Sequence, residues 1–311
     1  MKKYCFGVDV GGTTIKLGLF TVEGKLLEKW EIPTRTENQS EAVLPDVAAA
    51  VLGKMKEKGI EKEEVEGVGF GVPGPVTAEG VIVMNANLGW RNKHAAKELE
   101  ELLGLPCKGG NDVRTAGLGE LWKGGASGYK NAVFITLGTG VGAAIIVDGK
   151  VILGSQGAAG EVGHIKVDGE IEEACGCGGV GCMEQFASAP GIVKMTKKLL
   201  EESEKPSLLR EEEVTAKTVF DAVKAGDELA IEVAEKFGHY LGYSLAAAAA
   251  LLDPEVFIIG GGVSKAGEIL ITYVQKYYKK YVWPGCRDKK FVLAKLGNDA
   301  GIYGAASYVK M

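Results

Sequence analysis

Hydrophobic residues near the N-terminus fall into short runs separated by glycine-containing turns. Residues 4–10, 15–20 and 25–31 are rich in apolar positions at strand-like spacing, which predicts three strands. The connections read Gly-Gly-Thr-Thr at 11–14 and Glu-Gly at 23–24, and both are typical of tight turns. The chain is therefore expected to begin with three strands joined by turns.

The spacing of the hydrophobic residues then changes from strand-like to helical. Within residues 40–59 apolar side chains recur at helical spacing, and residues 65–72 return to a glycine-rich apolar run. That run ends at the turn Pro73-Gly74-Pro75. The predicted order of this first part is β-β-β-α-β.

A similar order begins again in the middle of the chain. Residues 132–137 predict a strand, residues 138–142 form a second glycine turn, and residues 143–147 and 150–153 predict returning strands. The repeat indicates two related α/β domains with a cleft between them, where ligands would bind at the strand ends. A chance recurrence of glycine turns is the alternative interpretation.

The second half carries mostly helical patterns. We expect two or three helices between residues 189 and 252, a strand at 255–259 ending in three glycines, and a late strand at 291–295. Residues 299–309 predict a terminal helix with Asn298 or Asp299 as its N-cap.

Length and composition narrow the class of protein. A chain of 311 residues favours two domains, and 46 glycines, about twice the usual share, suggest many tight turns. The net charge of −5 argues against nucleic acid as the main partner. We also expect no signal peptide, and no apolar run reaches the ~18 residues of a membrane span. These features predict a cytoplasmic protein.

Three of the six cysteines share a motif with one histidine. Within nineteen residues the chain carries a histidine and a Cys-x-Cys-x4-Cys group, namely His164, Cys175, Cys177 and Cys182. Such ligands suit a closed tetrahedral zinc site, which would be structural rather than catalytic. Reactive or disulfide-bonded cysteines are the alternative. The remaining cysteines and histidines are expected to be inert or packing residues: Cys5, Cys107, Cys286, His94 and His239.

The two glycine turns suit phosphate binding. Gly11 and Gly12 would let backbone N–H groups approach phosphate oxygens, and the threonines that follow add hydroxyl donors. Asp9, just before that turn, is a candidate magnesium ligand, and residues 138–140 would supply a matching clamp. Turns that merely join strands remain the alternative.

Asp112 is the candidate catalytic carboxylate. It follows Gly110-Asn111, after an apparent strand end at residues 105–107, and precedes a helix expected to start near Val113. Capping of that helix and general-base catalysis are equally compatible with this position. The amides of residues 85–90, Asn87 among them, would suit sugar hydroxyls, although Asn87 could be an ordinary turn residue.

Several motifs taken together resemble the ROK family of sugar kinases and repressors, and most closely its bacterial glucokinases. The resemblance covers essentially the whole chain. It is carried by residues 9–16 (DVGGTTIK), 110–112 (GND), 137–142 (LGTGVG), 160–164 (GEVGH) and 175–184 (CGCGGVGCME).

The resemblance implies two RNase H-like domains of the actin-like ATPase superfamily, with an interdomain cleft and a zinc-bearing insertion. We expect an N-terminal α/β domain at residues 1–115 and a larger domain at 116–297 that carries the zinc motif. A C-terminal helix at about 298–311 would pack back on the first domain. The implied activity is ATP-dependent phosphorylation of glucose to glucose 6-phosphate by a homodimer.

The resemblance also implies a role for each matched residue. Asp112 would be the general base. The expected sugar contacts are Gly74, Pro75, Asn87, Asn111, Asp112, Glu161, His164 and Glu184. The expected phosphate and Mg²⁺ residues are Asp9, Gly11, Gly12, Thr13, Thr14, Lys16, Gly138, Thr139 and Gly140, with Gly261 and Gly262 near the nucleoside. Structural Zn²⁺ would be bound by His164, Cys175, Cys177 and Cys182.

One residue departs from the family pattern. Arg114 stands where relatives commonly carry a small side chain, so it is expected either to point to solvent or to alter the rim of the pocket. The sugar therefore stays open, with fructose, mannose, N-acetylglucosamine and N-acetylmannosamine as alternatives to glucose. A donor such as polyphosphate and a non-catalytic sugar-sensing regulator are further alternatives. We expect no helix-turn-helix segment before the phosphate motif.

Overall fold

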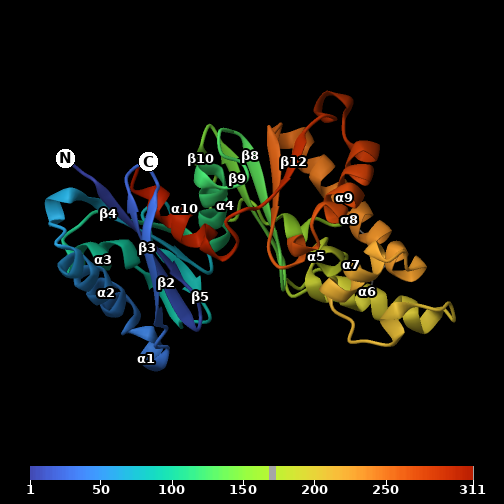
Figure 1. The fold of residues 1–311 in the computed structure, drawn as a ribbon, viewed down its shortest axis with the longest axis horizontal. Coiled ribbons are helices and arrows are strands. Elements are labelled where there is room, and N and C mark those ends of the chain that lie inside the picture. The colour runs from blue at the N-terminus through green and yellow to red at the C-terminus, as the bar shows by residue number, and fades with distance from the viewer. Residues whose placement is uncertain (168–172, 311) are drawn as a thin grey trace. The chain divides into compact units, whose positions relative to one another are not determined.

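A computed structural model describes residues 1–167 and 173–310 of the protein (Figure 1). The chain forms two compact units. The first comprises Met1–Gly128, Ala144–Ala159 and Lys295–Met311, and the second comprises Tyr129–Ala143 and Gly160–Ala294. The fold is α/β, as predicted, and each of the two large sheets mixes parallel and antiparallel strands.

The first sheet has five strands in the order β3-β2-β1-β4-β7. They are β1 (Tyr4–Val10), β2 (Thr14–Thr21), β3 (Leu26–Pro33), β4 (Val65–Val72) and β7 (Cys107–Asn111). Strands β1, β2 and β3 pair antiparallel, whereas β4 and β7 run parallel to β1. The strand end expected at residues 105–107 is wrong, because β7 starts at Cys107 and delivers Asn111 to the sheet edge.

Helices and a small hairpin complete the first unit. They are α1 (Glu37–Ser40), α2 (Val43–Lys58), α3 (Ala95–Leu103), α4 (Asp112–Lys123), α10 (Ala300–Tyr308), the pair β5 (Ile82–Asn85) and β6 (Trp90–Lys93), and 3-10 turns at Lys62–Glu64 and Gly297–Asp299. Asp299 takes the N-cap position of α10, yet its side chain makes no cap bond and instead accepts from Lys29 Nζ at 2.7 Å. The predicted N-cap position is therefore confirmed, although the cap has no side-chain hydrogen bond. Met311, the end of the predicted helix, lies outside the described residues.

Helix α10, red in Figure 1, packs on β1, β4 and α4. The approach is close enough to require glycine on the sheet. A Cβ added to Gly7 would lie 1.9 Å from Ile302 O, and one added to Gly69 would lie 1.7 Å from Ala305 O. These two glycines let the last helix cover a face that the N-terminal strands present.

The second sheet also has five strands, in the order β10-β9-β8-β11-β12. They are β8 (Ala132–Leu137), β9 (Val141–Val147), β10 (Lys150–Val151), β11 (Val256–Gly260) and β12 (Lys290–Leu293). Strands β8, β11 and β12 are parallel, so their carboxyl ends share one edge of the sheet.

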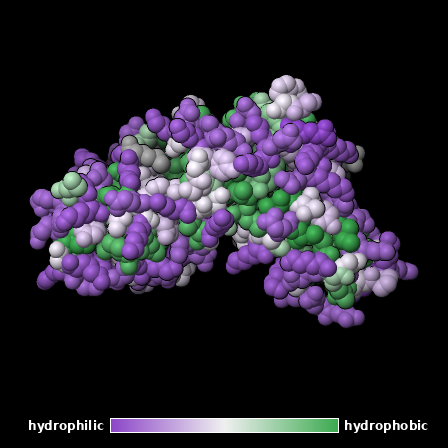
Figure 2. Space-filling model, turned by 45° about the horizontal axis from the view of Figure 1, so that its top comes forward, coloured by the Kyte–Doolittle hydropathy of each residue, from purple (hydrophilic) through white to green (hydrophobic). Residues whose placement is uncertain are grey.

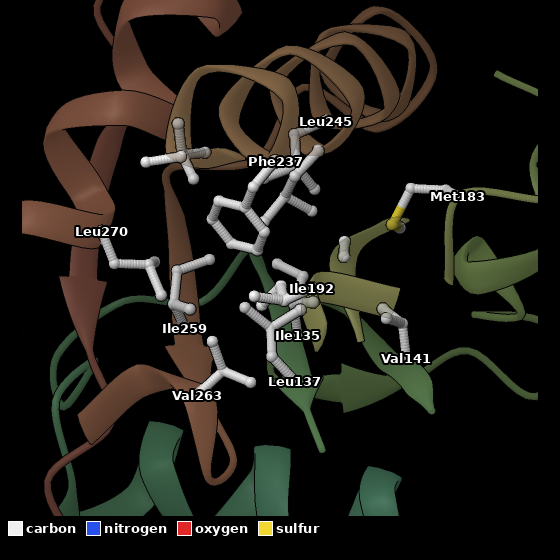
Figure 3. Packing of buried hydrophobic residues seen from close by; sticks show 14 of the residues in the cluster. Ile135, Leu137, Val141, Met183, Ile192, Phe237, Leu245, Ile259, Val263 and Leu270 are labelled. Carbon is white, nitrogen blue, oxygen red and sulfur yellow. The ribbon is translucent and has the colours of Figure 1, made fainter. Parts of the chain in front are cut away.

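Helices of the second unit bury a hydrophobic core against its sheet. They are α5 (Glu184–Ala187), α6 (Ala189–Glu202), α7 (Ala216–Lys224), α8 (Glu228–Leu252) and α9 (Glu268–Tyr281), with 3-10 turns at Val162–His164, Leu208–Arg210, Val263–Ala266 and Pro284–Cys286. Figure 3 shows Phe237 and Leu245 of α8 pointing toward Ile135 and Ile259 of the sheet. Each such side chain contributes about 2 kcal/mol when fully buried.

The surface is mostly polar. Figure 2 shows hydrophilic residues over most of the drawn face, with hydrophobic ones gathered mainly at its centre right. Exposed apolar side chains include Leu251 (84%) and Trp283 (66%). Across the described parts of the chain, no helix combines the length and the apolar character that crossing a membrane requires.

Candidate active site

Polar residues of the first unit gather where three parallel strands end. Strand register places Asp9 of β1 opposite Gly71 of β4, and Val72 of β4 opposite Asn111 of β7. The carboxyl ends of parallel strands form one edge, which is the usual ligand-binding edge of such a sheet. Asp9, a predicted Mg²⁺ ligand, therefore lies at the same sheet edge as the Gly74 turn and Asn111, which are predicted sugar contacts.

Asn111 rather than Asp112 caps helix α4. Its Oδ1 accepts from Arg114 N at 3.2 Å, so the capping alternative for Asp112 is wrong. Its Nδ2 donates to Asp112 Oδ1 at 2.8 Å and to Gly74 O at 3.1 Å. Asp112 Oδ1 also accepts from Val113 N at 2.9 Å. One oxygen of the carboxylate is thereby held, and the orientation of the group is fixed.

The two carboxylates at this edge are electrostatically unusual. Burial raises the pKa of Asp112 above its ordinary value. Burial also raises the pKa of Asp9 to about 6, with the Lys16 ammonium opposing the shift and the Asp112 carboxylate adding to it. Two neighbouring carboxylates that the interior disfavours as anions form a site that a cation would stabilise.

The turn after β1 is preformed. Gly11 N donates to Thr14 O at 3.1 Å, and Gly11 O accepts from Thr34 Oγ1 at 2.8 Å. Gly12 and Thr13 are exposed, and a Cβ at Gly12 would meet no atom within 4 Å. The turn thus presents open backbone, which is what close approach of a phosphate requires.

The second unit brings its two glycine turns to one sheet edge. Thr136 of β8 lies opposite Gly260 of β11, so the turns that follow these strands are neighbours. A Cβ at Gly261 would lie 2.4 Å from Leu137 O, which makes glycine necessary there. Gly138 N donates to Gly140 O at 3.0 Å, and the space around Gly138 and Gly262 is open.

The four predicted zinc ligands lie close together in the structure. The ligand atoms of His164, Cys175, Cys177 and Cys182 all lie within 4.8 Å of one another. Cys177 Sγ lies 3.6 Å from Cys182 Sγ, close to the edge of about 3.8 Å that Zn–S bonds of ~2.3 Å give a tetrahedron. The backbone N–H of Gly179 lowers the pKa of the Cys177 thiol, which favours the thiolate. The four residues fit a zinc ion, and Lys166 Nζ, 3.3 Å from Cys182 Sγ, balances thiolate charge.

Two glutamates flank this cluster. Glu184 Oε1 lies 2.9 Å from Cys175 Sγ and 3.6 Å from His164 Nδ1, whereas Glu161 Oε2 lies 4.0 Å from His164 Nε2. The imidazole therefore turns Nδ1 toward the sulfur atoms and Nε2 toward Glu161. Glu184 Oε2 also accepts from Val141 N at 3.3 Å, which ties the cluster to the strand after the Gly138 turn.

Two amides near β5 differ in what they do. Asn85 is buried, donates to Pro73 O at 2.9 Å and accepts from Leu88 N at 3.0 Å, so it shapes the turn. Asn87 is exposed in the same turn between β5 and β6. The structure thus leaves Asn87 accessible and gives the structural role to its neighbour.

Supporting residues around Asn111 were not found from the sequence. Thr115 Oγ1 donates to Asn111 O at 2.7 Å and lies 3.3 Å from Tyr308 Oη. A Cβ at Gly110 would lie 2.0 Å from that hydroxyl, so the glycine makes room for Tyr308. Gly110 was the signal available in the sequence, but Tyr308, which occupies the space beside it, lies almost two hundred residues later in the chain.

Arg114 does not point to solvent. Its side chain is 3% exposed, and Nη2 donates to Gly157 O at 2.5 Å and to Ala159 O at 2.9 Å. The solvent alternative is therefore wrong. The guanidinium instead reaches the segment that leads to Glu161.

Comparison with known proteins agrees with the motifs. The model of the ROK family matches residues 5–311. A glucokinase of Halalkalibacterium halodurans is 40% identical over 99% of this chain and 95% of its own. The structure of a ROK family glucokinase from Streptomyces griseus in complex with glucose and AMPPNP is 32% identical, covers 99% of both chains and has a TM-score of 0.75. A ROK hexokinase structure from Thermus thermophilus is 31% identical over 97% of this chain and 96% of its own, with a TM-score of 0.81. The chain belongs to the ROK family.

Proposed function

We propose that the protein is an ATP-dependent glucokinase that phosphorylates glucose to glucose 6-phosphate. The observation that carries this proposal is the near-complete match to glucokinases, one of them described with glucose and AMPPNP. The buried, oriented Asp112 carboxylate supplies the group that such a transfer needs.

Asp112 acts as the general base. Its carboxylate takes the proton from the 6-hydroxyl as the oxygen attacks the γ-phosphorus, and ADP leaves. Asn111 and Val113 hold one carboxylate oxygen, so the other can meet the hydroxyl. The raised pKa makes the carboxylate a stronger base than an exposed aspartate.

The glycine turns are the proposed nucleotide-binding segments. The turn at residues 11–14, with Lys16 beyond it, and the turn at 138–140 offer N–H and hydroxyl donors to phosphate oxygens, while Gly261 and Gly262 lie beside the nucleoside. Their open backbone supports this assignment. Asp9 would hold Mg²⁺, which neutralises charge on the transferred phosphoryl group when bound. The raised pKa of Asp9 supports a cation at this carboxylate.

The proposed sugar contacts are the residues that the family resemblance implies. They are Gly74, Pro75, Asn87, Asn111, Asp112, Glu161, His164 and Glu184. The Cys/His cluster would hold structural Zn²⁺ through His164 Nδ1 and three sulfur atoms, leaving Nε2 for a hydroxyl. With four protein ligands the metal offers no open position for catalysis.

A coupled ADP-release assay over a panel of hexoses tests the proposal. We expect turnover with ATP to be fastest on glucose, and to require Mg²⁺. Faster turnover of N-acetylglucosamine, N-acetylmannosamine, fructose or mannose would reassign the substrate, and polyphosphate as the better donor would reassign the donor. Sugar binding by calorimetry without turnover of any sugar would identify a regulator.

We further propose a homodimer, as the family resemblance implies. Light scattering should then give twice the chain mass of 32.7 kDa. A mass of one chain at micromolar concentration would contradict it.

A further inference from the structure

Arg114 stands in the first turn of α4, two residues after Asp112. Its backbone N–H is bound by the Asn111 cap at 3.2 Å, so the residue starts from a fixed point. From there the side chain runs through the interior, where it is 97% buried (3% exposed). A guanidinium is seldom buried so completely, because removing its charge from water is costly.

The charge is not balanced by a carboxylate. Within the described residues Arg114 forms no ion pair, and its Nη1 is buried with no hydrogen-bond partner. Only Nη2 is used, in bonds to Gly157 O and Ala159 O. Stability alone favours an apolar side chain over such an arrangement. The two carbonyl bonds are therefore what the arginine provides.

The segment that receives these bonds has little support of its own. Residues 152–161, between β10 and the turn at Val162–His164, form no helix or strand. At its ends, Ile152 N donates to Ile145 O at 2.9 Å and Gly160 O accepts from Ala143 N at 3.1 Å. Between these ends, Gly157 N reaches Gly154 O only at 3.5 Å, and Ala159 N donates to Leu153 O at 3.1 Å. The charged guanidinium of Arg114 donates to Gly157 O and Ala159 O, and each of these hydrogen bonds is stronger than one from a neutral backbone N–H group.

The same segment sets the backbone of Glu161. Val162 N donates to Gly160 O at 2.8 Å, and Glu161 lies between them with φ −75° and ψ 49°. This is close to an inverse γ-turn, in which the central residue is aimed by its neighbours. The Glu161 side chain is 60% exposed, so packing does not hold it and its direction depends on the backbone before it.

We propose that Arg114 is a positioning residue for the sugar: by holding Gly157 and Ala159 it aims Glu161 at a substrate hydroxyl. This rests on the proposed function, and it assigns to Arg114 an effect on sugar affinity rather than on the phosphoryl-transfer step.

Arg114→Met keeps a long apolar side chain but removes the guanidinium group. We expect the KM for glucose to rise about tenfold, with kcat within about threefold and the KM for ATP unchanged, as expected for loss of roughly two charge-assisted bonds that act on ground-state binding. Arg114→Lys keeps the charge with a single nitrogen and should recover only part of the affinity. The exposed Arg287→Met is the matched control and should match the wild type. A fall in kcat with an unchanged glucose KM would overturn the proposal.

A double-mutant cycle tests whether Arg114 affects glucose binding through Glu161. If Arg114 acts through Glu161, then Arg114→Met in the Glu161→Gln background should change glucose affinity by less than about twofold. Fully multiplicative effects would overturn the proposal.

Hydrogen–deuterium exchange tests, without any sugar, whether the Arg114 hydrogen bonds stabilise residues 157–160; we call this stabilisation the brace. Amides of residues 157–160 should exchange at least about tenfold faster in Arg114→Met, while those of β1 stay protected. Unchanged exchange would overturn the brace, whether or not the wild type phosphorylates glucose. Conversely, faster exchange in a protein that phosphorylates no sugar would sink the proposed function and leave the brace intact. If Arg114→Met does not fold, Arg114→Lys carries the same measurements.

Discussion

At the scale of single residues, the neighbours of Asp112 set the orientation and the pKa of its carboxylate. Asn111 takes the capping role and at the same time donates to the carboxylate, so one side chain both caps the helix and orients the proposed base. Burial then raises the pKa of Asp112 above its ordinary value.

Replacing the base should remove catalysis and spare binding. We expect Asp112→Ala to lower kcat by about 10²–10⁴-fold, the usual contribution of a general base, while glucose remains bound. Calorimetry with glucose and the ADP-release assay measure the two effects. Retention of most of the activity would show that another group is the base.

The pKa of Asp9 predicts an effect of pH on stability. Its pKa is about 6 in the folded protein and ~3.9 when unfolded, so the folded state binds more protons between these values. This residue therefore favours the folded state at low pH and loses that effect as the pH rises through 4 to 6. In urea unfolding without Mg²⁺, Asp9→Asn should be more stable than the wild type at pH 7 and close to it at pH 4. An equal difference at both pH values would contradict this.

At the scale of elements, we expect the Val162–His164 turn and the start of α5 to depend on a metal bound by the Cys/His cluster. Cys177→Ser should release zinc, and the glucose KM should rise because His164 and Glu184 lose their common support. Metal analysis and steady-state kinetics measure the two effects. Cys286→Ala, a buried cysteine outside the cluster, should keep its zinc. A fully active, metal-free Cys177→Ser would separate the metal from the sugar site.

Elements with a regular pattern could be predicted from the sequence. The strands at Tyr4–Val10 and Val65–Val72 were predicted with the bounds that the structure shows, because their largely apolar runs end at glycine or proline turns. The cluster of His164 and three cysteines was likewise predictable, since its ligands lie close in the chain.

Features that depend on distant partners could not be predicted. Arg114 is buried because carbonyls more than forty residues later accept its bonds. Glu120 is fully buried because it accepts from Gly125 N at 2.7 Å and, far along the chain, from Leu296 N at 2.7 Å. No local pattern distinguishes these two side chains from exposed charges on a helix. The β5–β6 hairpin was missed for a related reason, since its strands are four residues each and partly exposed.

At the scale of the whole molecule, the first unit is built from both ends of the chain. Gly69→Ala should test this, because its Cβ would lie 1.7 Å from Ala305 O and force α10 off the sheet. We expect a loss of about 3 kcal/mol or more in the free energy of unfolding. Gly53→Ala on α2, where a Cβ meets nothing within 4 Å, should instead stabilise by about 0.5–1 kcal/mol. Chemical unfolding measures both, and equal effects would contradict the close approach.

The packing of α10 on β1 and β4 has a consequence during synthesis. A ribosome releases Met1–Gly128 long before Lys295–Met311, with an interval of roughly 10–30 s at ~5–20 residues per second. Throughout that interval the sheet face carrying Gly7 and Gly69 is uncovered, while the residues of the second unit emerge in one nearly continuous stretch. The unit that is translated first is thus completed last, and a nascent chain halted before Ala300 would expose an apolar sheet face to chaperones.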